Sequence, residues 1–485
     1  MSATIADAPV VSSAPKELAR VLSLRDAIAL VLTVIGTGVF LKSAAMAQLV
    51  GSPYRVLLAW LAAGLLSLAG ALTYAELGAM LPRAGGEYVF LREAFGDLPA
   101  FLFGWTSVIL IASGGIAAVA TALASFLGSF VHMNTVWVAR DFNVLGQVVH
   151  WRLGLEQLVA VAVIVLFAAI NARGVVLGAR VQWLSTLAKL GGIAIIVLGA
   201  FLLSHTGSAA NLHKPVTADA TPVGAGAFGA AMLAALWAYQ GWANVPMVAG
   251  EIERPERNVP RALIYGMVLV IAVYLITNAA FFYALPFSDA LTSNSTAYRD
   301  ALPIAARAAQ TFFSYGAQLV SLAFVVAAIG ALNGIILMNS RVPYAMARDK
   351  VFFKSMATLN ERGVPANAIW FLAIWAILLA LSGTFDQITT SVIFAVWVFT
   401  ALVGASLFVL RRKIPTAPRR YRTLGYPVVP VLFILVALWL VINSFSTSPV
   451  ESAAGVVLIA LGLPVYFYLR RTGWLHRARM KERPE

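Results

Sequence analysis

The sequence predicts an all-α polytopic membrane protein, and three observations support that fold class. The chain has 485 residues, 60% hydrophobic and 12% charged, whereas soluble domains are about 25% charged. Apolar runs of about 20 residues, the length a helix needs to cross a bilayer, recur along most of the chain. Most of the 35 Lys and Arg residues lie between these runs, concentrated in alternate connections. This distribution is typical of an integral plasma membrane protein, located in the inner membrane if the source is bacterial.

Twelve membrane-spanning helices can be placed by the length of the apolar runs. Because Lys and Arg favour the cytoplasmic side, their distribution predicts that both termini are cytoplasmic. The polar tail 1–22 precedes the spans, and the basic tail 470–485 is expected to contact anionic lipid. Two connections, 132–152 and 286–310, are long enough for short interfacial segments. The twelve spans are 25–46, 55–79, 100–131, 153–170, 181–203, 225–250, 261–285, 311–340, 366–383, 388–410, 427–445 and 452–469.

Composition also argues against several classes of protein. The net charge of +14 does not indicate nucleic-acid binding, because the basic residues lie between apolar runs. The chain has no cysteine, so a disulfide-linked partner is excluded. No connection is long enough for a nucleotide-binding domain, and the five histidines lie in loops or at span ends. We therefore expect neither an enzyme nor an ATP-driven pump, and no cofactor or metal. No oligomeric state is predicted.

The first span contains a glycine-rich interruption, Val34–Phe40. Gly36 and Gly38 flank Thr37, and each glycine costs about 1 kcal/mol relative to Ala in a helix. A helix broken here exposes backbone amides at the positive start of its second half, which is an anion site. The alternative is a small-residue face that packs against a neighbouring helix.

A second interruption lies about 200 residues later, in Leu236–Trp242. It contains Trp237, Tyr239, Gln240 and Gly241. Aromatic residues beside a broken helix can form the wall and gate of a pocket, or they can simply pack. Two interrupted segments at corresponding positions of two halves indicate the substrate site of a transporter.

Two polar residues lie deep within predicted spans. Lys189 is nine residues beyond Arg180, about 13 Å into the membrane at about 1.5 Å per residue. An ionisable residue at that depth suggests function, either in place of a coupling cation or as a proton carrier. The alternative is a structural lysine paired with backbone carbonyls. Asn333 either lines the site or forms an interhelical hydrogen bond.

Charged residues cluster in the cytoplasmic connections, together with Pro and Gly. This mixture predicts ion-paired hinges at an inner gate or scaffold, whereas solvated turns are the alternative. The residues expected to take part are Glu76, Arg83, Glu251, Arg261 and Arg341.

Seven segments together resemble the amino acid–polyamine–organocation (APC) superfamily, and within it the L-type amino acid transporter group and its bacterial relatives. The resemblance implies two inverted five-helix repeats, residues 23–203 and 225–410, followed by two peripheral helices in 427–469. The segments are Ile35–Phe40, Tyr74–Gly96, Ala188–Leu190, Trp237–Trp242, Glu251–Ala262, Leu332–Arg341 and Arg419–Pro430.

The resemblance also implies roles for individual residues. Gly36, Thr37 and Gly38 match positions that receive the substrate α-carboxylate. The carbonyls of Val34 or Ile35, of Trp237 and of Gln240 match positions that receive the α-amine. Trp237 matches an aromatic lid, and Lys189 matches a lysine that replaces the sodium of sodium-coupled members.

Two positions depart from the family pattern. Gln240 stands where close relatives often have Gly or Ser, and Ala243 stands where arginine-exchanging relatives carry Glu. Without a buried carboxylate, a dibasic side chain would lack a partner. The sequence therefore favours sodium-independent exchange of neutral L-amino acids by alternating access. The alternatives are a proton-coupled symporter, an exchanger of cationic amino acids or polyamines, and a transporter-like sensor.

Overall fold

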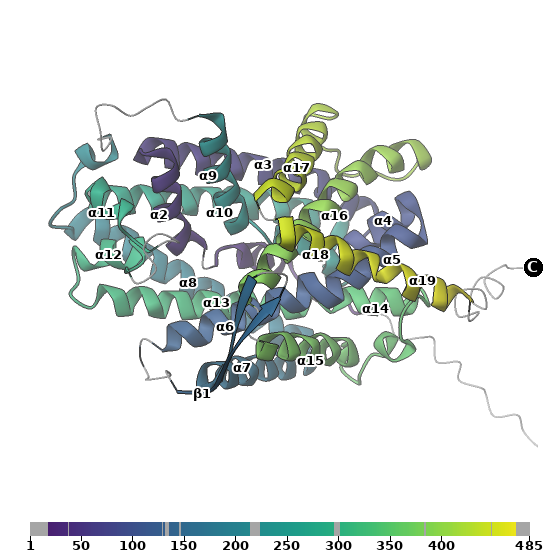
Figure 1. Ribbon diagram of the computed structural model, residues 1–485. Coiled ribbons are helices and arrows are strands. Elements are labelled where there is room, and N and C mark those ends of the chain that lie inside the picture. The colour runs from purple at the N-terminus through teal and green to yellow at the C-terminus, as the bar shows by residue number, and fades with distance from the viewer. Residues whose placement is uncertain are drawn as a thin grey trace, which may run out of the picture.

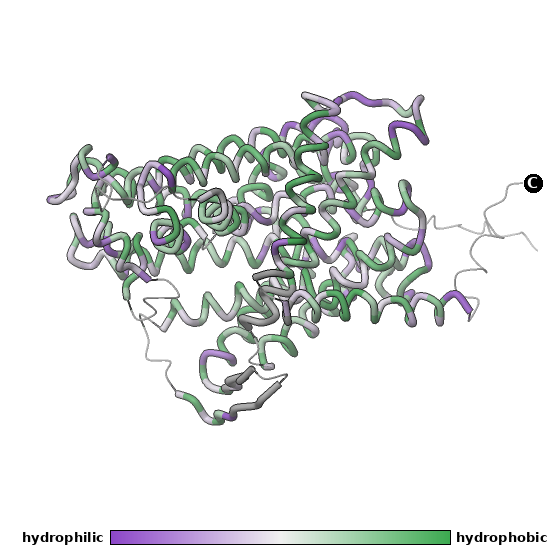
Figure 2. Tube along the Cα trace, turned by 45° about the horizontal axis from the view of Figure 1, so that its top comes forward, coloured by the Kyte–Doolittle hydropathy of each residue, from purple (hydrophilic) through white to green (hydrophobic). Residues whose placement is uncertain are grey.

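The computed structural model describes residues 18–36, 38–128, 130, 135–144, 147–213, 224–294, 301–382, 385–447 and 449–471. Within this part of the chain, 10 helices are long and apolar enough to cross a membrane. Most of the long helices run side by side in one bundle (Figure 1). Apolar residues dominate along their lengths (Figure 2). The mainly helical fold with several helices able to span a membrane is therefore confirmed.

The first half of the chain contains α1 (Leu24–Val31), η1 (Leu32–Val34), α2 (Gly38–Val50), α3 (Pro53–Met80), α4 (Glu87–Phe95), α5 (Asp97–Thr106), η2 (Ser107–Ile111), α6 (Ala112–Leu127), β1 (Val136–Val144), β2 (Gln147–Gly154), α7 (Leu155–Ala172), α8 (Val175–Leu203) and η3 (Ala209–Leu212). The second half contains α9 (Ala225–Ala238), η4 (Trp242–Glu251), α10 (Pro255–Ala284), α11 (Phe287–Leu291), α12 (Ile304–Gln310), α13 (Gly316–Asn339), α14 (Arg341–Arg348), η5 (Lys354–Ala357), α15 (Ala366–Ser382), α16 (Phe385–Lys413), α17 (Val428–Thr447), α18 (Pro449–Ala460) and α19 (Gly462–Arg471).

Both predicted helix interruptions are present. In the first span, α1 continues into η1, which ends at Val34, and α2 begins at Gly38. In the second, α9 ends at Ala238 and η4 begins at Trp242. Gly241 has a φ of +120°, which side-chain-bearing residues rarely adopt, so glycine is needed at this turn. The second half of one broken helix packs against the first half of the other, because α2 contacts α9 (Figure 1).

A third irregularity was not predicted. The span Asp97–Leu127 contains a π-helical segment, Ser107–Ile111, between α5 and α6. Ser113 Oγ donates to the Val108 carbonyl at 2.6 Å, which satisfies a backbone group in the widened turn. Such π segments are frequent at functional sites.

The two long connections differ from each other. Residues 286–310 contain the short helices α11 and α12, as expected for interfacial segments. In the other connection, β1 and β2 form an antiparallel hairpin at the edge of the bundle (Figure 1). The indole of Trp151 in β2 donates to the Leu381 carbonyl of α15 at 2.9 Å, which attaches the hairpin to the helices.

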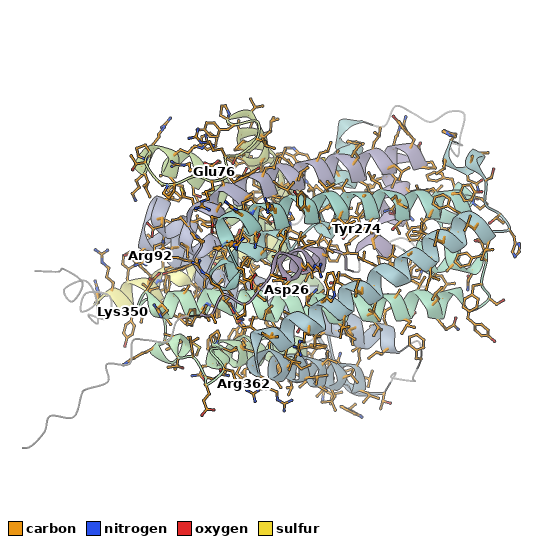
Figure 3. The ribbon with its side chains drawn as sticks, turned by 180° about the vertical axis from the view of Figure 1, so that it is seen from behind. Asp26, Glu76, Arg92, Tyr274, Lys350 and Arg362 are labelled. Carbon is orange, nitrogen blue, oxygen red and sulfur yellow. The ribbon has the colours of Figure 1, made fainter. Side chains whose placement is uncertain are left out.

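Several polar side chains lie in the interior. Lys189 and Arg341 are among the largest fully buried side chains, and buried charges need polar partners. Arg92 and Lys350 lie toward one end of the bundle, whereas Tyr274 lies deeper within it (Figure 3). The polar interior therefore includes positions near the two helix breaks.

Candidate functional site

A cavity of about 230 Å³ lies between the two broken helices. Its walls also include the π segment, α6, α13 and α16. Residues of both interruptions therefore face one shared space. Six of the predicted site residues line it: Val34, Gly36, Gly38, Trp237, Gln240 and Gly241.

The two glycines of the first break have different surroundings. A Cβ on Gly38 would lie 2.4 Å from the Ala238 Cβ, so glycine permits close packing of α2 on α9. A Cβ on Gly36 would approach only the Val34 carbonyl oxygen, at 3.8 Å. Gly36 therefore borders open space in the cavity, whereas Gly38 also holds the two broken helices together. Thr37 lies outside the described residues.

A tyrosine that the sequence analysis missed connects the two breaks. The Tyr274 hydroxyl of α10 lies 2.7 Å from the Val34 carbonyl oxygen and 2.8 Å from the Ala238 carbonyl oxygen. A hydroxyl has one proton, so it donates to one of these carbonyls at a time. Each carbonyl keeps acceptor capacity for a second donor, such as a ligand ammonium.

Trp237 forms one wall of the cavity and is partly exposed. The Lys42 ammonium of α2 lies 4.4 Å from the centre of its ring, within cation–π range. The backbone N–H of Gln240 donates to the Trp237 carbonyl at 3.3 Å, closing the turn after α9. The indole is thus held between the two broken helices.

Three of the predicted site residues do not line the cavity: Ile35, Tyr239 and Asn333. The Tyr239 hydroxyl instead donates to the Trp60 carbonyl at 3.2 Å. Asn333 donates to the Gly178 carbonyl at 2.9 Å and accepts a hydrogen bond from Asn171 at 2.9 Å. Asn333 therefore joins α13 to α7 and α8, which is the interhelical alternative.

Lys189 lies beside the first break, although it does not line the cavity. Its side chain is 1% exposed, and Nζ donates to the Leu32 carbonyl at 2.5 Å. Leu32 belongs to η1, whose carbonyl end carries partial negative charge. Among the described residues, no carboxylate forms an ion pair with Lys189. The ammonium therefore links the fifth predicted span to the carbonyl end of the first half-helix.

Two ion pairs with buried glutamates join helices at the positions expected for a gate or scaffold; Arg341 is also buried, whereas Arg411 is partly exposed. Arg341 Nε and Nη2 donate to Glu251 Oε1 and Oε2 at 2.6 and 2.8 Å. Arg411 Nε and Nη2 donate to Glu76 Oε1 and Oε2 at 2.9 and 2.6 Å. The backbone N–H of Thr423 also donates to Glu76 Oε2 at 2.7 Å. We call Glu76, Glu251, Arg341 and Arg411 the ion-pair layer.

The other two predicted gate residues are more peripheral. Arg83 pairs with Glu93, and the Arg83 side chain is 53% exposed, so this pair adds little stability. Arg261 is exposed. Within the described ranges it forms no ion pair, and Glu256, five residues earlier, bonds to Arg420 at 3.0 Å.

Glu87 is the main site residue that the sequence analysis missed. It lines the cavity, is 6% exposed, and accepts a hydrogen bond from the Tyr74 hydroxyl at 2.5 Å. Burial raises the pKa of its carboxyl to about 7, although the Tyr74 hydroxyl opposes that rise. The premise that no buried carboxylate is available to the site is therefore wrong. Its position directly after Gly85-Gly86, between two spans, is the only signal in the sequence.

Residues 22–468 match the family model for amino acid permeases. The chain belongs to the amino acid permease family. It is 31% identical over 458 residues to the serine/threonine exchanger SteT of Bacillus subtilis, covering 94% of this chain and 98% of that protein. It is 29% identical over 474 residues to the human b(0,+)-type amino acid transporter 1, covering 97% and 91%. It is 26% identical over 449 residues to the human cystine/glutamate transporter, covering 92% and 84%.

These findings confirm the predicted APC resemblance and the general class of function. The permease is a multi-pass transporter of amino acids in the plasma membrane, and its relatives are transporters rather than enzymes.

Proposed function

We propose that this permease is a sodium-independent secondary transporter that exchanges neutral L-amino acids by alternating access. The observation that carries the proposal is the shared cavity between the two broken helices. Amides at the start of α2, around Gly36–Gly38, have no intrahelical partners and would receive the α-carboxylate. Carbonyls of Val34 or Ile35, Trp237 and Gln240 would receive the α-amine.

The cavity wall supports small or apolar substrate side chains. Gly114, Gly115, Ala118 and Ala243 contribute small residues to it. The relative named as a serine/threonine exchanger also transports amino acids with uncharged side chains. Trp237 would close over the bound substrate, and the Lys42 ammonium would steady its ring.

Sodium independence is supported by the position of Lys189. Its ammonium lies at the carbonyl end of a half-helix, where sodium-coupled transporters of this architecture bind the ion. The Lys189 ammonium would therefore supply the charge that sodium supplies elsewhere, and it would couple the first and fifth spans.

We further propose the complete topology: twelve spans with both termini cytoplasmic. Residues 23–203 and 225–410 would form two inverted five-helix repeats, and 427–469 two peripheral helices. The interrupted helices, which come first in each half, support this arrangement. The tails 1–22 and 470–485 would be cytoplasmic; residues 1–17 and 472–485 lie outside the described part. Of the gate residues, Glu76, Arg83, Glu251 and Arg341 would move with the helices that their ion pairs join.

The test is uptake of labelled alanine, leucine and arginine into proteoliposomes. Vesicles are empty or preloaded with unlabelled amino acid, with and without sodium or a pH gradient. We expect uptake of alanine and leucine that requires preloading and does not require sodium. Strict dependence on sodium, or uptake of arginine alone, would contradict the proposal. Binding without flux would indicate a sensor.

A further inference from the structure

We propose that Glu87 is a proton-binding site within the substrate cavity, and that neutral amino acids bind most tightly when its carboxyl is protonated. This inference rests on the proposed function and couples substrate binding to protonation of Glu87. Lys189 and the helix breaks retain the roles given above.

Glu87 lies in the wall of the substrate cavity. Among the described residues that line the cavity, Glu87 is the only one with an ionisable side chain. It comes from α4, between the spans Pro53–Met80 and Asp97–Leu127. The substrate and this carboxyl would therefore share one small space.

Glu87 has no cationic partner among the described residues. In the described structure the Glu87 carboxyl forms no ion pair, and its hydrogen-bond partner is the Tyr74 hydroxyl of α3. The charged side chains that the structure describes on the elements packed against α4 are paired elsewhere or exposed. Glu251 of η4 pairs with Arg341 of α14, and Arg411 of α16 pairs with Glu76. On α4 itself, Arg92 pairs with Asp97 of α5 and with Asp349, and Glu93 pairs with Arg83. The exposed basic residues of these elements are Arg348, Arg412 and Lys413.

The segment before Glu87 contacts the second broken helix. The Gly85 N–H donates to the Met247 carbonyl of η4 at 2.8 Å. Gly86 has a φ of +49°, and a Cβ there would lie 2.7 Å from the Met247 backbone nitrogen. Glycine thus lets the segment before Glu87 lie directly on η4. A movement of η4 during transport would move Glu87 with it.

These features give the coupling a physical cause. A buried carboxyl resists ionisation, which is why the pKa of Glu87 rises to about 7. A substrate that enters the cavity displaces water and makes the ionised carboxylate costlier still. Protonation therefore favours substrate binding, and by linkage substrate binding favours protonation to the same degree.

The size of the effect follows from the populations. At a pKa of about 7, the protonated fraction falls from about 0.9 at pH 6 to about 0.1 at pH 8. If only the protonated form binds substrate, the apparent dissociation constant rises about tenfold over that range.

The experiment measures equilibrium binding of labelled serine, alanine and leucine to the purified full-length permease at pH 6, 7 and 8. Glu87→Gln mimics the protonated carboxyl, so it should bind tightly at all three values. Glu361→Gln alters an exposed glutamate and should retain the wild-type profile. Tyr74→Phe removes a hydrogen bond to the ionised carboxyl, so its transition should move to higher pH.

Several outcomes would overturn the proposal. One is a wild-type affinity that does not change with pH; another is the same pH dependence in Glu87→Gln. Lysine binding that is lost in Glu87→Gln, with no pH effect on neutral substrates, would make Glu87 a site for a substrate cation instead. If Glu87→Gln does not fold, an unshifted transition in Tyr74→Phe contradicts the proposal. No binding of any neutral amino acid by the wild type would overturn the proposed function itself.

Discussion

The ion-pair layer and the cavity wall both bury glutamates, but they neutralise the charge differently. Glu76 and Glu251 are 0% and 1% exposed, and each receives two hydrogen bonds from one arginine. Glu87, at 6% exposure, receives a tyrosine hydroxyl instead. A bidentate arginine fixes the charge and orients the helices that carry it. A hydroxyl leaves the carboxyl free to gain a proton, so the first region suits a scaffold and the second suits a site that changes state.

The largest expected effect comes from breaking an ion pair. Arg341→Met leaves Glu251 charged and buried without its cation, so the free energy of unfolding should fall by about 3–5 kcal/mol. Arg261→Met is the control, because Arg261 is exposed, and it should change stability by less than about 0.5 kcal/mol. Denaturant titration of the purified variants measures both. Equal effects would show that the layer is not a scaffold.

The next effect tests the carboxylate position. Gly36→Val should reduce amino acid exchange about 100-fold while the protein remains folded, because its side chain enters open cavity space. Gly115→Ala, at another position in the cavity wall and also without close neighbours, should retain most of the activity. Exchange and melting temperature are measured together. Near wild-type exchange by Gly36→Val would remove Gly36 from the site. Gly38→Val is a poorer test, because it would also force α2 away from α9.

Lys189→Met should have a smaller effect, about a tenfold loss of exchange. The Leu32 carbonyl would lose its buried donor, and an unsatisfied group costs about 1–3 kcal/mol. If Glu87 is the proton site, the remaining exchange should keep its pH dependence. A wild-type rate would rule out coupling through Lys189. Exchange that no longer depends on pH would show that Lys189, and not Glu87, is the proton-binding residue.

The smallest effect concerns the aromatic wall. Lys42→Met removes a cation–π contact with Trp237, worth about 0.5–1 kcal/mol, so the apparent affinity should weaken about threefold. The same substitution in a Trp237→Leu background should have no further effect. Additive losses in the double variant would show that Lys42 acts elsewhere.

The sequence predicted the parts of the fold that depend on local chemistry. The breaks at Gly36–Gly38 and Gly241 follow from glycines within apolar runs, and the burial of Lys189 follows from its depth. Partners distant in sequence could not be assigned: Arg341 lies 90 residues from Glu251. Glu87 was missed because the sequence does not distinguish its burial from that of Glu93, six residues later. Glu87 is buried and Glu93 is more exposed only because of how the chain folds around them. The hairpin and the π segment likewise depend on packing against other helices.

An experimental structure with leucine bound would show whether the two broken helices together form the amino acid site. We predict the α-carboxylate within hydrogen-bond distance of the amides at Gly36–Gly38. The α-amine should contact carbonyls of both breaks, and the indole of Trp237 should cover the ligand. Leucine bound elsewhere, or contacting only one break, would contradict this account.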